Sequence, residues 1–158
     1  MPTIQRIKRK KTPAAQPDAK EPKQLARLLT SAEIKQRQAA LQAVLHFGQR
    51  GEHQALADRL IPLLWTGKTD MQRGAQLALV RLGEPAVRAL LQALLRGPSP
   101  DQQVPVLETL GLVARGLPES VRGPVQIVLQ QWFSLTWSRA VLHALAEAVA
   151  LIREVQAA

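Results

Sequence analysis

The amino-acid sequence predicts an all-α protein, and three observations carry this prediction. Leu, Ala, Val and Gln dominate the chain, and this mixture favours helices. Runs of Val, Ile and Thr that alternate with polar residues are missing, so no sheet is expected. Helix-starting and helix-ending signals recur regularly along the chain. With 158 residues and 46% hydrophobic side chains, the chain fits one domain with a sizeable core.

Residues 1–24 differ from the rest of the chain in charge and composition. They contain four Pro residues and few large apolar side chains, so burial cannot offset the entropy of ordering them. We therefore expect a disordered basic tail over 1–24 and a helical repeat domain over 25–158. Of the net charge of +9, the tail contributes +5, from seven cations and two acidic residues. Its densest run is Arg6, Lys8, Arg9, Lys10 and Lys11.

The first helices follow this tail. A short helix is expected over Gln24–Leu29, with its leucines on one face. Thr30 and Glu33 then predict a capping box, in which each side chain accepts a backbone N–H of the first turn. The helix that they open is expected to end at Gly48 and Gly51. Its expected inward residues are Ile34, Leu41, Val44 and Leu45.

The next two helices have clear ends. One is expected over His53–Trp65, where residues 66–67 stop it. The other begins with Thr69 or Asp70 as its cap and ends at Gly83. Their expected inward residues are Leu56, Leu60, Ile61, Leu63, Leu64, Ala75, Ala78, Leu79 and Leu82.

Proline residues mark the helices that follow. Pro85 is expected at a first helical position, where its missing N–H costs nothing, and that helix closes at Gly97. Ser99 and Pro100 open another helix, which Pro105 should kink. Their expected inward residues are Val87, Leu90, Leu91, Leu94, Leu107, Leu110 and Val113.

Two helices complete the chain. The first begins at Pro118, and the second is capped by Ser134 or Thr136 and continues through Ile152. About seven helices therefore follow Thr30, joined by loops so short that neighbours must run antiparallel. The inward residues expected on the helix after Pro118 are Val121, Val125, Val128 and Leu129.

One unit carries a family resemblance. Asp70–Leu91 reads DMQRGAQLALVRLGEPAVRALL, an Ala-rich helix, a Gly-x-Pro-Ala-Val turn and a Leu-Leu helix. This unit resembles the short HEAT repeats of phycocyanobilin-lyase-like proteins. Looser copies are spaced by 36, 30 and 36 residues, at Arg37, Arg73, Gln103 and Arg139. The resemblance implies a short right-handed α-solenoid of antiparallel helix pairs.

No set of residues predicts an active site. The chain has no Cys, and its three His residues lack acidic neighbours at metal-ligand spacing, so neither a metal nor a cofactor is expected. No Ser lies in a glycine elbow, and no Gly-rich loop follows a strand. One HEAT-like family excises alkylated DNA bases with an essential Asp and a concave aromatic face. Here the aromatics at 132–137 lie far in sequence from Asp58, Asp70 and Asp101, so we expect no enzyme.

The expected solenoid predicts a binding surface. In such a fold the second helix of each pair lines the concave side. Arg88, Gln92 and Arg96 are spaced by four residues and so share one helix face. A polar, mildly basic strip is predicted there, since Arg and Gln can both bind carboxylates, amides or phosphates. Its other members are Arg59, Arg122, Gln126 and Gln130.

The last helix predicts a second surface. Its apolar residues fall on more than one side, although a terminal repeat should present a polar outer face. Together with the nearby Trp137, Leu142 and Val149 therefore mark a possible interface. The occupant could be a second copy of the chain or a larger partner.

These observations leave two functional hypotheses. In the first, the protein is a noncatalytic scaffold or adaptor that binds a protein partner, and the tail adds an electrostatic contact. In the second, it is an accessory nucleic-acid-binding protein, whose tail and concave Arg residues bind phosphates. A base-excising or lyase-like enzyme is a distant third. No apolar run is long enough to span a membrane and no secretory signal is evident, so a cytoplasmic protein is expected.

Overall fold

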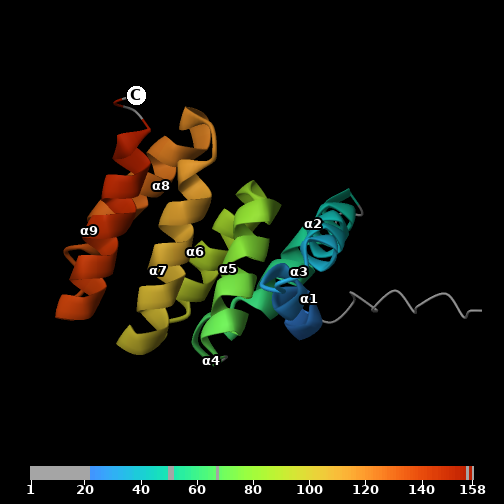
Figure 1. Ribbon diagram of the computed structural model, residues 1–158. Helices are drawn as coiled ribbons and strands as arrows, with labels where there is room; N and C mark the ends of the chain where they lie inside the picture. Colours follow the sequence, from blue (N-terminus) through green and yellow to red (C-terminus); the bar gives the residue numbers. More distant parts are fainter. Residues whose placement is uncertain (1–21, 50–51, 67, 156, 158) are drawn as a thin grey trace, which may run out of the picture.

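A computed structural model describes residues 22–49, 52–66, 68–155 and 157 of the chain (Figure 1). This described part contains nine α-helices and no strand, which confirms the predicted all-α class. The helices are α1 (Pro22–Leu29), α2 (Ile34–Gln49), α3 (His53–Leu60), α4 (Leu63–Thr66), α5 (Thr69–Leu82), α6 (Glu84–Leu95), α7 (Pro100–Arg115), α8 (Glu119–Trp132) and α9 (Arg139–Glu154).

The helices form two rows. In the first row α1, α5, α7 and α9 lie side by side, each packed against the next (Figure 1). In the second row α3, α6 and α8 lie behind them. Here α3 packs against α6, but α6 makes little contact with α8, which packs mainly on α9. The second row is therefore open between α6 and α8.

The end of the first row differs from the prediction. It is α1, not the helix after Thr30, that packs along α5, and α2 contacts both of them. Ile34, expected to point inward, is 63% exposed at the start of α2, while Val44 is buried. The helix ends at Gln49, between Gly48 and Gly51, and this agrees with the predicted end; the side chain of Leu45 lies outside the described part.

The predicted capping box does not form. The Thr30 hydroxyl donates hydrogen bonds back to α1, to the carbonyl oxygens of Ala26 (3.3 Å) and Arg27 (3.1 Å). Ser31 takes over at the start of α2, where its Oγ accepts the backbone N–H of Glu33 at 3.2 Å. Thr30 lies directly after a helix, so the carbonyls that α1 leaves unpaired compete successfully for its hydroxyl.

Pro62 divides the helix that was expected over His53–Trp65. Because Pro lacks an N–H and its ring clashes with the preceding turn, α3 ends at Leu60 and α4 begins at Leu63. The apolar residues around the break, Ile61, Leu63 and Leu64, are nevertheless all buried. The sequence pattern predicted burial here but missed the bend.

The start of the last helix also lies later than predicted. Ser134 donates through its Oγ to the carbonyl of Gln131 at 2.7 Å, so it belongs to the end of α8. Ser138 is the N-cap residue of α9, and its own N–H lies 3.4 Å from the hydroxyl of Thr136. The stretch between α8 and α9 is therefore a loop of 133–138.

The central pair α5 and α6 matches its prediction closely. Gly83 ends α5 with a φ of 74°, and Gly97 follows α6 with a φ of 71°, a region that favours glycine. Ala75, Ala78 and Leu79 are buried as expected, and Pro85 lies in the first turn of α6. The N-cap of α5, however, is Lys68, so neither Thr69 nor Asp70 caps it.

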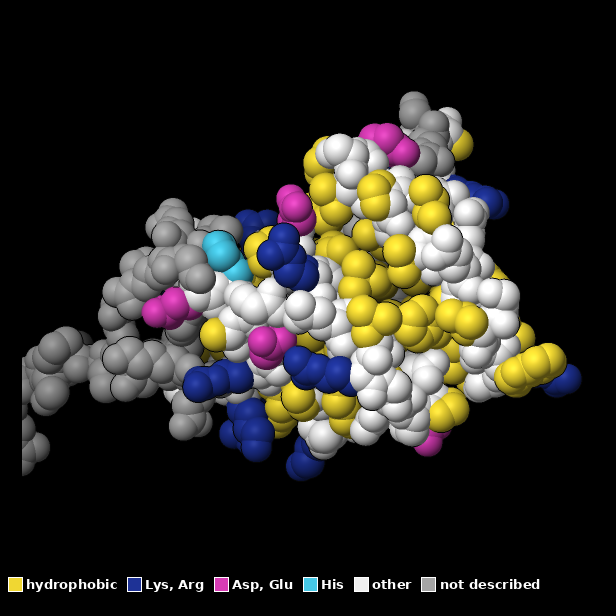
Figure 2. All heavy atoms as spheres, turned by 180° about the vertical axis from the view of Figure 1, so that it is seen from behind, with side chains coloured by type: hydrophobic (Ala, Val, Ile, Leu, Met, Phe, Trp, Pro, Cys, Tyr) yellow, Lys and Arg dark blue, Asp and Glu magenta, His cyan; other side chains and the backbone are white. Residues whose placement is uncertain are grey.

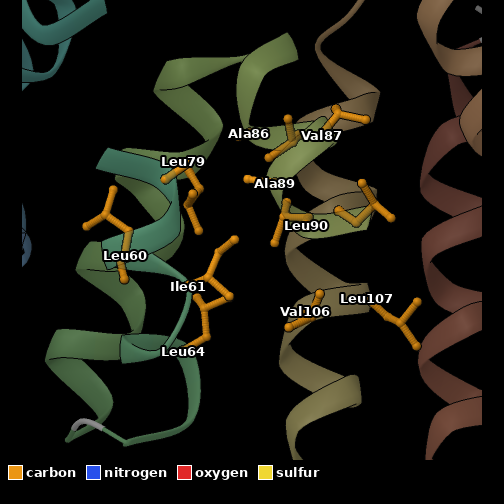
Figure 3. Packing of buried hydrophobic residues seen from close by; sticks show 14 of the residues in the cluster. Leu60, Ile61, Leu64, Leu79, Ala86, Val87, Ala89, Leu90, Val106 and Leu107 are labelled. Carbon is orange, nitrogen blue, oxygen red and sulfur yellow. The ribbon is translucent and has the colours of Figure 1, made fainter. Parts of the chain in front are cut away.

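The core runs between the two rows. Leu60, Ile61 and Leu64 of the α3–α4 segment lie near Leu79 of α5 and Leu90 of α6, and all five belong to one buried cluster (Figure 3). The cluster continues through α7 and α9, so one core joins both rows. Among the described residues, Thr109 is the one polar side chain that is fully buried. Its hydroxyl donates to the Pro105 carbonyl at 2.7 Å, and Gln76 Nε2 lies 3.4 Å away on α5.

Glycine sets the spacing at both ends of the first row. A Cβ atom at Gly74 of α5 would overlap the backbone of Ala26 in α1. A Cβ atom at Gly111 of α7 would lie 2.8 Å from the Cα of Ala148 in α9, well inside van der Waals contact. The helix backbones therefore meet directly at these two places.

We predict that Gly74→Ala and Gly111→Ala each lower the free energy of unfolding by about 2 kcal/mol or more, as measured by urea denaturation. Ala in a helix interior normally stabilises by about 0.5–1 kcal/mol, so a loss reverses the usual sign. The control is Gly116→Ala, where φ is −84° and the nearest atom to an added Cβ is 3.7 Å away. This control should be neutral or stabilise by about 0.5 kcal/mol. Equal stabilisation by all three variants would contradict the close helix contacts.

Candidate binding face

The Arg and Gln residues predicted for α6 share one exposed ridge. Arg88, Gln92 and Arg96 are all exposed, and Arg59 is exposed on the neighbouring α3. Within the described part of the chain, no carboxylate forms an ion pair with Arg88 or Arg96. These two guanidinium groups are therefore free to bind an external acceptor.

The residues predicted on α8 contribute less to this strip. Arg122 is half-buried, and its guanidinium lies 3.1 Å from the Glu119 carboxylate one turn earlier. Its Nε is buried without a hydrogen-bond partner. Gln126 is half-buried and Gln130 is exposed. The structure therefore brings together the α6 residues as a basic ridge, while α8 offers a locally neutralised Arg.

An apolar groove that the sequence pattern did not predict lies beside this ridge. It opens between α6 and α8, reaches α3, and has a volume of about 590 Å³. Figure 2 shows this side of the molecule, with hydrophobic side chains gathered in a hollow that has Lys or Arg side chains along one side. Polar groups line its edge, namely His53, Gln54, Glu84, Arg88 and Ser120. Its apolar lining is Pro85, Val87, Leu91, Val121, Pro124, Val125 and Val128.

The groove exists because the apolar face of α8 is wider than the part of it that packs against other helices. Val125 and Leu129 are buried as expected, but Val121 and Val128 are only half-buried and line the groove. Pro124 is exposed between them. This second apolar stripe on α8 is visible in the sequence and could have indicated the groove. Its side chains are too short to fill the space toward α6.

A second, smaller hollow lies on the other side of α6. Its volume is about 340 Å³, and Ile61, Pro62, Trp65 and Ala93 contribute apolar lining. Arg96 borders it, as Arg88 borders the larger groove. The basic ridge of α6 therefore runs between two apolar hollows, and we call this whole surface the α3–α6–α8 face.

The expected interface on the last helix is largely used inside the protein. Val149 is buried and Leu142 half-buried, because α9 packs against both α7 and α8 and needs an apolar side for each. This corrects the prediction that Val149 faces outward. Trp137 behaves differently, since it is 97% exposed in the loop before α9.

Two of the described titratable groups interact on α9, and a third lies nearby on α7. His143 Nε2 lies 3.2 Å from a Glu147 carboxylate oxygen one turn later on α9, which corrects the expectation that no His has an acidic neighbour at ligand spacing. Although Glu108 on α7 is an exposed residue, partial desolvation of its carboxyl group raises its pKa, the Glu147 carboxylate raises it further, and His143 acts in the opposite direction. Among the described residues, no group of three His, Cys, Asp or Glu side chains could hold a metal ion. None of the described helices is long and apolar enough to cross a membrane.

The tail residues Arg6, Lys8, Arg9, Lys10 and Lys11 lie outside the described residues. Their part in binding is therefore a prediction from charge alone.

We predict that Glu108→Gln raises the free energy of unfolding near neutral pH and leaves it nearly unchanged below about pH 4, where glutamate is protonated even in the unfolded chain. A carboxyl group with a raised folded-state pKa favours the folded state while it is protonated, and that contribution is lost as pH rises through the folded pKa. Thermal unfolding of both proteins at the two pH values measures the difference. The same gain at both pH values would show that ionisation of Glu108 is not the cause.

Comparison with known proteins adds no assignment. No family model, curated protein or solved structure matches this chain. The likeness of Asp70–Leu91 to a HEAT repeat therefore rests on its own residues, and a function has to be argued from the α3–α6–α8 face.

Proposed function

We propose that this protein is a noncatalytic scaffold or adaptor that binds a protein partner through the α3–α6–α8 face. The observation that carries the proposal is the apolar groove between α6 and α8, next to the basic ridge of Arg88, Gln92 and Arg96. The framework would be a short HEAT-like α-solenoid, with α5 and α6 as its most typical repeat. In that arrangement, this face is the concave side.

The groove supplies the energy of binding in this proposal. Valine, leucine and proline side chains on its floor are wetted in the free protein, and burying them against apolar groups of a partner removes that surface from water. Grooves between helices commonly receive an amphipathic helix or an apolar segment of another protein. An apolar floor of this kind favours contact with apolar side chains of another protein.

The ridge supplies orientation and specificity. Arg88 borders the larger groove and Arg96 the smaller hollow, so a partner that fills either one passes close to a guanidinium group. Arginine forms paired hydrogen bonds with carboxylates in a fixed plane. We therefore expect the partner segment to carry Asp or Glu residues beside its apolar ones. The basic tail would add a tethered electrostatic contact.

Nucleic acid is the second candidate for this surface. Arg59, Arg88 and Arg96 are exposed together, and the net charge of +9 favours phosphate binding. The apolar groove argues against it as the main ligand, because Val and Leu side chains offer a phosphate backbone no hydrogen bond. Binding to duplex DNA or RNA would fall steeply with salt.

We predict that affinity capture with the full chain retains one protein in stoichiometric amount after nuclease treatment. Val128→Arg should abolish this retention because it fills the groove with a charged side chain. Arg88→Glu should weaken it at least about tenfold by repelling acidic groups of the partner. The matched control is Arg73→Glu on α5, an exposed residue in the first row.

Circular dichroism of each variant confirms that the helices are intact. Retention that disappears with nuclease would favour the nucleic-acid hypothesis. Retention that Val128→Arg and Arg73→Glu leave equally unchanged would contradict the proposed face.

A further inference from the structure

The loop between α8 and α9 presents an apolar surface that nothing in the described chain covers. Trp137 is 97% exposed, Leu135 70% and Phe133 36%. Single exposed apolar residues are common, but three within five positions of one loop are a concentration of exposed apolar side chains, and such patches often mark a contact site.

Backbone hydrogen bonds and the start of α9 fix the two ends of this loop. The backbone N–H of Ser134 donates to the Gln131 carbonyl at 3.2 Å, and that of Leu135 donates to the Trp132 carbonyl at 3.0 Å. Ser138 then begins α9 three residues after Leu135. Because both ends are fixed, the loop can bind without a large ordering cost.

We propose that Leu135 and Trp137 of one copy insert into the α6–α8 groove of a second copy of the chain. An apolar projection and an apolar hollow of about 590 Å³ both lie on the surface of the same chain. The inference rests on the proposed function, since it names an occupant for the same groove. A second copy in the groove would compete with the protein partner and so regulate its access.

Charge and hydrogen bonding also fit this occupant. Residues 131–138, QWFSLTWS, contain no charged side chain, so their burial desolvates no ion. The indole N–H of Trp137 is a donor only and needs an acceptor when it is buried. Glu84, His53 and Ser120 at the edge of the groove offer such acceptors.

The size of the contact predicts weak association. A loop tip in a groove buries less than the roughly 1,600 Å² of a standard protein interface. Reciprocal insertion, in which each loop occupies the other copy's groove, doubles the buried area and closes a twofold dimer. The dimer should therefore populate at high protein concentration.

Sedimentation velocity of the full chain at rising concentration tests this inference. We expect a monomer at low concentration and a dimer at high concentration. A loop variant, Leu135→Ser with Trp137→Ser, and a groove variant, Val128→Arg, should each weaken association at least about tenfold. Leu95→Ser, which removes a 75% exposed apolar side chain outside the groove and loop, should have no effect.

Mixing the two variants is the decisive step. The loop variant keeps its groove and the groove variant keeps its loop, so the mixture regains one of the two insertions. It should associate more strongly than either variant alone and less strongly than the wild-type chain. If Val128→Arg loses helicity, Ser120→Arg at the exposed edge of the groove replaces it.

A monomer at every concentration, or variants that associate like the wild-type chain, would overturn the inference. So would a mixture that associates no more strongly than either variant alone, because a loop-to-loop contact would then explain the losses better. Each of these results leaves the proposed function standing, since partner capture by the groove is measured separately. Conversely, failed capture leaves the self-association result unchanged.

Discussion

The direct contact of helix backbones in the first row is the constraint on which the rest of the structure depends. At Gly74 and Ala26, and again at Gly111 and Ala148, no side chain separates one helix from the next. Helices that meet this closely leave little freedom in their spacing. The first row therefore acts as the frame, and the second-row helices occupy positions that this frame allows. Between α5 and α7, side chains separate the two helices, and the buried Thr109 hydroxyl lies against Gln76 there.

This frame explains why the groove exists. The position of α8 is set mainly by α9, on which it packs, and α9 is in turn held by α7. The position of α6 is set by α3 and α7. Two helices that are held by different neighbours need not meet each other. The gap between them is lined with side chains too short to close it, chiefly Val121, Pro124 and Val128. A surface made in this way can stay open without strain in either helix.

The sequence predicted the bounds and buried faces of those helices whose structure depends only on nearby residues. Helical spacing identified the buried residues of α5 and α6, and Gly83 and Gly97 marked real ends. The same reasoning failed at Thr30, where two helix ends compete for one hydroxyl, and at Pro62, whose effect the apolar pattern masked. The exposure of Arg88, Gln92 and Arg96 also followed from spacing by four. The groove could not be predicted in this way, because it depends on the distance between α6 and α8, and no local sequence pattern encodes that distance. Val149 was misplaced for the same reason, since α9 contacts two helices at once.

The proposed binding face requires that α6 and α8 are held apart and leave apolar side chains open to solvent. Methyl NMR with a soluble paramagnetic probe measures this most directly, at a protein concentration low enough to keep the chain monomeric. Methyl groups of Val121, Val128 and Leu91 should broaden strongly, while those of Val125 and Leu129, which are buried, should not. Equal protection of all five residues would mean that the two helices close together in solution, and would contradict the account.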